Sequence, residues 1–185
     1  MEDSQIIALY WARDEQAIQK SEEKYGVTCL TLAQRIVHNH EDAEECVNDT
    51  WVRSWQTMPP QRPNYLRAFF LKITRNLALS RWESTHAQKR GGGEVPLVLE
   101  ELQECLPGRE NVEDALLARE LGSVVNAFLK TLSRRSCDIF LRRYFYLEST
   151  AAIAARYHMT VGAVGMDLSR SRKKLRAYLE EEYHD

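Results

Sequence analysis

The amino-acid sequence predicts an all-α protein with two small helical domains, the second containing a helix-turn-helix. Apolar residues recur at three- and four-residue intervals along most of the chain, which is the period of an amphipathic helix. No segment alternates apolar and polar residues as a half-buried strand does, and no Asn-Gly hairpin turn occurs. Three consecutive glycines at 91–93 interrupt the pattern, because Gly loses too much backbone entropy inside a helix. The expected domains are therefore residues 1–88 and 112–185, joined by a flexible, acidic, Gly-rich linker at 89–111.

Composition is that of an ordinary soluble globular protein. The 185 residues are 44% hydrophobic and 28% charged, which is ordinary for globular proteins. No apolar run approaches the roughly 20 residues that span a bilayer, and the N-terminus has no signal pattern, so we expect a cytoplasmic protein without membrane insertion. The four cysteines lie far apart, which favours free, mostly buried thiols, and His38-Asn39-His40 lacks a partner spaced for a metal site. We expect no enzyme activity, no cofactor and no small-molecule substrate.

Charge is distributed unevenly along the chain, although the formal net charge is only −2. Residues 41–56 and 91–115 are acidic, whereas residues 65–90 and 165–176 are basic. This alternation indicates two separate nucleic-acid faces on a protein that also docks another partner.

The N-terminal half, residues 2–57, is helical in character throughout. Glu41-Asp42 predict the start of a helix whose inner face holds Ala43, Val47, Thr50, Trp51 and Ser54. Its other face is polar, and from periodicity alone a solvated surface is the simpler interpretation. That face carries Glu45, Asn48, Asp49, Val52, Arg53 and Gln56.

Three prolines then predict a loop over 57–64, because Pro cannot continue a helix. A new helix is expected from Tyr65, with Leu66, Phe70, Ile73 and Leu77 on its inner side. Four cations fall on the opposite half, which favours nucleic-acid contact over a plain solvated face. They are Arg67, Lys72, Arg75 and Arg81.

Helices resume after the linker, from Asn111. Ser133 is a plausible N-cap for a helix ending near Tyr146. Ser149 or Thr150, and then Thr160, start two further helices that are joined by a tight turn. An ordinary helical hairpin fits these two, but the cations of 170–176 favour a DNA-reading helix-turn-helix.

Three blocks together resemble the extracytoplasmic-function group of bacterial sigma factors, in the sigma-70 superfamily. Residues 42–55 (DAEECVNDTWVRSW) resemble its polymerase-docking helix, and residues 71–81 (LKITRNLALSR) its promoter-melting helix. Residues 149–176 resemble its C-terminal helix-turn-helix. The blocks occur in family order and spacing, covering most of the chain outside the linker. The resemblance implies a sigma factor that binds core RNA polymerase and promoter DNA, with an anti-sigma factor as a further candidate partner.

The resemblance also implies roles for individual residues. The polymerase contacts would be Glu45, Asn48, Asp49, Arg53 and Gln56. The minus-ten contacts would be Gln61, Arg62, Asn64, Arg67, Lys72, Arg75, Asn76 and Arg81. The minus-thirty-five contacts would be Thr160, Val161, Ala163, Met166, Arg170, Arg172, Lys173 and Arg176. The linker would pass through the active-site cleft of the polymerase.

A few positions depart from the family pattern. Ser80 stands where Asp is common, and His158 takes the place of the turn glycine. Gly165 weakens its helix, and Asp167 is expected to repel phosphate. Two other classes of protein fit the helical pattern: a stand-alone, homodimeric helix-turn-helix regulator, and a helical adaptor that binds only protein. Binding to core polymerase distinguishes the sigma factor from the regulator, and promoter-dependent initiation distinguishes it from the adaptor.

Overall fold

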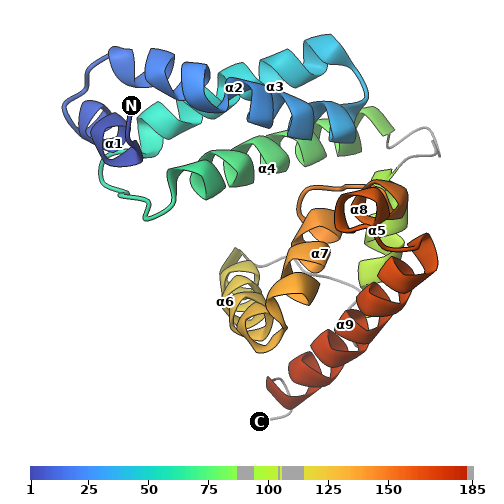
Figure 1. Cartoon of the computed structure of the whole chain (residues 1–185). Helices are drawn as coiled ribbons and strands as arrows, with labels where there is room; N and C mark the ends of the chain where they lie inside the picture. The colour runs from blue at the N-terminus through green and yellow to red at the C-terminus, as the bar shows by residue number, and fades with distance from the viewer. Residues whose placement is uncertain (87–93, 104, 106–114, 183–185) are drawn as a thin grey trace. The chain divides into compact units, whose positions relative to one another are not determined.

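The computed structural model describes residues 1–86, 94–103, 105 and 115–182, which form helices and no strand (Figure 1). The all-α prediction is confirmed for this part of the chain. Contacts divide the molecule into two compact units, Met1–Gly91 and Gly92–Asp185. Within the described ranges, no helix is both long enough and apolar enough to cross a membrane.

The first unit contains four helices: α1 (Asp3–Trp11), α2 (Gln16–Val37), α3 (His40–Thr57) and α4 (Leu66–His86). The last three pack against one another, and α1 packs against α2 at one end of the bundle (Figure 1). Phe70 lies at the centre of the core, fully buried. Its ring centroid is 5.2 Å from that of Trp51 and 5.5 Å from that of Tyr25. Such tilted aromatic pairs add stability beyond the apolar area they bury.

Local signals set the boundaries of α3 much as predicted. The Asn39 side chain accepts a hydrogen bond from the Asp42 backbone N–H at 3.1 Å, so the helix begins at His40, one residue before Glu41. Glu41 and Asp42 then lie in the first turn, where carboxylates favourably oppose the helix dipole. The predicted inner face of α3 is buried, and the six residues of its polar face are exposed.

The buried face of α4 differs from the expected one. Leu66 and Phe70 are buried as predicted, but Ile73 is only half-buried, and Thr74 is fully buried instead. The reason is a polar pair inside the core: the hydroxyl oxygens of Thr50 and Thr74 lie 2.9 Å apart. Buried hydroxyls that satisfy each other can occupy positions that apolar periodicity assigns to the surface.

The second unit contains α5 (Glu94–Gln103), α6 (Ala115–Thr131), α7 (Arg134–Tyr144), α8 (Thr150–Tyr157) and α9 (Val161–Glu182). Its buried side chains include Phe128, Phe140, Ile153, Val164 and Leu168. Part of the predicted linker is thus a helix, α5, and it belongs to this unit. Cys105, also in the predicted linker, is buried. The remaining linker positions, 89–93, 104 and 106–111, lie outside the described residues.

The predicted N-caps of the second unit are confirmed. Ser133, Ser149 and Thr160 each accept a hydrogen bond from a backbone N–H three residues later. His158 ends α8 with φ of 53°, in the left-handed region that the turn requires. Three of the four cysteines are buried, Cys137 is half-buried, and all four are free, as expected.

Candidate nucleic-acid interface

The exposed face of α3 presents all five predicted polymerase contacts. Glu45, Asn48, Asp49, Arg53 and Gln56 are exposed, while the opposite face of the helix is held in the core. The arrangement gives a helix held by its buried face, with an exposed face that is polar apart from Val52, which suits docking to another protein. Whether these residues contact polymerase remains a prediction.

Arg81 connects α4 to this helix. Its Nε and Nη2 atoms both lie 2.8 Å from Asp42 Oδ1, and Nη2 also lies 2.7 Å from Glu45 Oε2. The hydrogen bond and positive charge of Arg81 hold the pKa of Glu45 below its ordinary value. The structure thus brings together a predicted minus-ten residue and a predicted polymerase residue, which bind each other.

Two shallow cavities follow the seam between α3 and α4. The larger is about 600 Å³ and is lined by Asp49, Arg53, Asn76 and Arg81, among others. The smaller is about 230 Å³ and is lined by Arg53, Gln61, Lys72 and Asn76, among others. Arg53 and Asn76 line both cavities, so predicted polymerase and minus-ten residues share one continuous surface.

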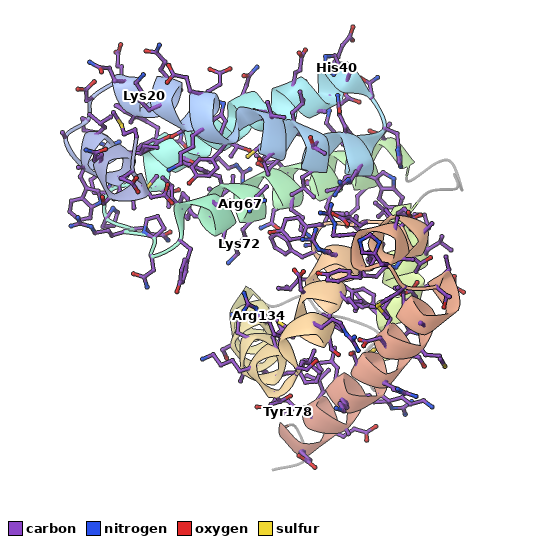
Figure 2. The ribbon with its side chains drawn as sticks, viewed as in Figure 1. Lys20, His40, Arg67, Lys72, Arg134 and Tyr178 are labelled. Atoms are coloured by element: carbon purple, nitrogen blue, oxygen red, sulfur yellow. The ribbon has the colours of Figure 1, made fainter. Side chains whose placement is uncertain are left out.

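The cations of α4 are not equivalent. Arg67 and Lys72, both labelled in Figure 2, are exposed along the helix. Arg75 is half-buried, and burial lowers the pKa of its guanidinium. Arg75 is half-buried because the buried face of α4 includes Thr74, its neighbour in sequence. Arg67 and Lys72 are therefore better placed than Arg75 for contact with a phosphate.

The loop before α4 exposes the three polar residues predicted to read a base. Gln61, Arg62 and Asn64 are all exposed. Beside them lie two exposed aromatic residues to which the sequence assigns no role in binding, Trp11 and Tyr65. Trp11 is the last residue of α1, and nothing in the sequence relates it to Arg62.

The first part of α9 exposes most of the predicted minus-thirty-five residues. Val161 and Met166 are exposed apolar side chains, and Arg170 and Lys173 are exposed cations. At 100° per residue, the last three lie within about 60° of one another on the helix. Thr160 caps the helix, Ala163 is half-buried, and Arg176 pairs with Glu180 at 2.9 Å.

Unlike Arg170 and Lys173, Arg172 is largely buried and contacts α5 and α7. Only 19% of its side chain is exposed, and its Nη1 lies 3.2 Å from Glu101 Oε2 and 2.8 Å from the Tyr144 hydroxyl. Burial opposes the ionisation of Glu101. Hydrogen bonds from Arg143 and Tyr144, and the charges of Arg143 and Arg172, outweigh it and hold the pKa of Glu101 below its ordinary value. Arg172, a predicted phosphate contact, is thus paired with Glu101 of α5.

Asp167 also lies in an environment that the sequence did not predict. The Ser136 hydroxyl donates a hydrogen bond to Asp167 Oδ2 at 3.1 Å, near the N-terminus of α7. The residue lines a cavity of about 440 Å³ together with Arg135, Arg170 and Lys173, among others. The Asp167 carboxylate thus contacts α7, and cations line the cavity beside it.

Comparison with protein families gives a match for part of the chain. Residues 23–88, which include most of α2 and all of α3 and α4, match the family model for Sigma-70 region 2. No curated protein matches the chain. Sigma-70 region 2 takes part in RNA polymerase binding and promoter melting. The match shows that this segment, which contains the predicted docking and melting helices, is similar to Sigma-70 region 2.

Proposed function

We propose that this chain is a sigma factor of the extracytoplasmic-function group, which binds core RNA polymerase and directs promoter-specific transcription initiation. One observation carries the proposal: the region 2 match covers α3, whose exposed face holds every predicted polymerase contact. A helix face that meets only solvent needs no particular residues, whereas a face that docks to a partner must be held in a fixed position. Here the opposite face is buried in the bundle, which fixes the helix in place.

In this proposal the two units engage the two promoter elements, and the polymerase performs the chemistry. The loop at 61–64 captures an unpaired minus-ten base, and the exposed cations Arg67 and Lys72 hold the melted strand by its phosphates. The helix α9 enters the major groove at the minus-thirty-five element, with Arg170 and Lys173 on adjacent phosphates. The protein acts in the cytoplasm, and an anti-sigma factor is a candidate partner.

Asp49 offers the most direct test because it is exposed on α3 and lines the larger cavity. Reversing its charge leaves the core intact but places a cation within the docking face. We expect Asp49→Lys to weaken binding to core polymerase at least about tenfold, as reversal of an interfacial charge commonly does. Run-off transcription from a genomic promoter library should fall in parallel.

The matched control is Glu181→Lys, which makes the same change of charge at an exposed position in α9 of the other unit. It should leave polymerase binding unchanged. Failure of the unmodified chain to bind polymerase, or binding that Asp49→Lys does not affect, would contradict the proposal. A chain that binds duplex DNA as a homodimer without polymerase would instead be a helix-turn-helix regulator. Polymerase binding without initiation at any promoter would indicate an adaptor.

A further inference from the structure

Trp11 lies next to the loop that is predicted to read a base, although it is far from that loop in sequence. It is the last residue of α1, and 43% of it is exposed. The guanidinium carbon of Arg62 lies 5.7 Å from the centroid of its ring. Figure 1 shows α1 at the same end of the bundle as the segment that joins α3 to α4. An indole and a guanidinium at this distance attract each other through a cation–π interaction.

The end of α1 is held firmly, so Trp11 is carried by a rigid element. Tyr10, its neighbour, is fully buried, and its hydroxyl lies 3.0 Å from that of Ser21. Just beyond it, Arg13 Nη1 donates a hydrogen bond to the Trp55 carbonyl at 2.6 Å. The Arg13 guanidinium also lies 5.3 Å from the centroid of the Trp55 ring. These contacts join the ends of α1 and α3, which fixes the position of Trp11 relative to the loop.

The chemistry of this surface matches an unpaired nucleic-acid strand. Tyr65, at the end of the loop, is 79% exposed, and Arg13 and Arg62 are exposed cations. Two carboxylates follow Arg13 in the sequence: Asp14 accepts a hydrogen bond from the Gln16 backbone N–H at 2.9 Å, and Glu15 is exposed. Surfaces that bind single strands combine aromatic rings for the bases with cations for the phosphates. Guanidinium planes also stack on unpaired bases.

We propose that Trp11 and Arg62 form one stacking platform for an unpaired base, extending the minus-ten site onto α1. The indole and the guanidinium together present the surface on which the base stacks, and the charge of the guanidinium attracts the adjacent phosphate. The inference rests on the proposed function of the loop, but it adds Trp11, which the family comparison does not cover because the match begins at residue 23.

The test uses the full chain with core polymerase and a fluorescently labelled single-stranded oligonucleotide of random sequence. We expect Trp11→Ala to weaken strand binding about tenfold, within the range for loss of one stacked base. Trp11→Phe, which keeps an aromatic face, should retain most of the affinity. Arg62→Ala should weaken binding by a similar factor, and the double variant should be little worse than either single variant. Val27→Ala, at an 81% exposed position on α2, is the control and should have no effect.

Intrinsic fluorescence separates stacking from a purely structural role. The emission lost in Trp11→Phe is that of Trp11, and in the unmodified chain this component should be quenched by the single strand but not by duplex. Unchanged strand affinity in Trp11→Ala, or no quenching, would overturn the inference while leaving the proposed function intact. Loss of polymerase affinity in Trp11→Ala would also overturn it, because the surface would then bind protein. An unmodified chain that binds neither polymerase nor strand would refute the proposed function itself.

Discussion

Replacing Glu101 by Ala should release α5 from the second unit. The Glu101 carboxylate accepts hydrogen bonds from Arg143 Nη2 at 2.7 Å, from the Tyr144 hydroxyl at 2.7 Å and from Arg172 Nη1 at 3.2 Å. The Arg143 side chain is only 3% exposed, whereas that of Glu101 is 25% exposed. The substitution therefore removes an anion from a nearly buried cation and leaves a buried hydroxyl with one partner fewer.

The expected cost follows from those contacts. Breaking a buried ion pair by removing one partner costs about 3–5 kcal/mol, because the remaining charge is left without compensation. Two features reduce that figure here: Glu101 is partly hydrated, and Arg143 still pairs with Glu94 and donates to the Glu148 carbonyl. We therefore expect the docking of α5 to weaken by about 2–3 kcal/mol, or roughly 30- to 150-fold in its opening equilibrium.

Amide hydrogen exchange measured by mass spectrometry would detect this change in peptides that cover 94–103. Glu100→Ala is the matched control, since Glu100 is the exposed neighbour on the same helix and the change in helix propensity is identical. Exchange should accelerate about 30- to 150-fold in Glu101→Ala and stay near the unmodified rate in Glu100→Ala. Equal exchange in the two variants would refute the reasoning, because the carboxylate would then contribute nothing specific.

Two more predictions concern charge. If the pair with Glu101 keeps Arg172 from DNA, Lys173→Ala should reduce the salt dependence of duplex binding by about one unit, while Arg172→Ala should leave it unchanged. A reduced slope for Arg172→Ala would show that this guanidinium reaches a phosphate after all. The second prediction concerns acidic pH. The pKa of Glu101 is lower in the folded state than in the unfolded state. The contribution of this carboxylate to the docking of α5 is therefore complete above about pH 4.3 and is lost as pH falls through the folded-state pKa. Relative to the intrinsic exchange rate at each pH, the protection of α5 should therefore fall at acidic pH in the unmodified chain and fall less in Glu101→Gln. An equal loss of protection in both would contradict the assignment.

The sequence predicted the helices, the caps and the polar face of α3, because these depend on neighbours within one turn. Ser149 and Thr160 cap their helices for local reasons, and the 3.6-residue period identifies which side of α3 is polar. It did not predict which threonines would be buried. Thr74 enters the core only because Thr50, on another helix, satisfies its hydroxyl, and no periodicity reports such a pairing.

The same limit applies to the candidate site. Counting cations on a helical wheel treated Arg67, Arg75 and Arg81 as equivalent, since all lie away from the predicted apolar stripe. The structure separates them: Arg67 is exposed, Arg75 is half-buried, and Arg81 binds two carboxylates. The difference depends on what lies across the bundle, which only the tertiary fold decides.

Carboxylates of the predicted linker form ion pairs with arginines of the second unit, which the charge of the segment alone does not reveal. The sequence predicts a flexible, acidic, Gly-rich linker at 89–111. In the structure, Val95 and Val98 are buried, and Glu94 and Glu101 bind arginines of the second unit.

Asp42 and Glu45 bind Arg81 in the same way. These four carboxylates count fully towards the net charge of −2, yet each lies against a cation. The arginines that they bind, Arg81, Arg143 and Arg172, count in the same total, so these pairs nearly cancel. The exposed cations Arg67, Lys72, Arg170 and Lys173 lie outside the pairs, so a chain of slightly negative charge can still present basic surfaces to DNA.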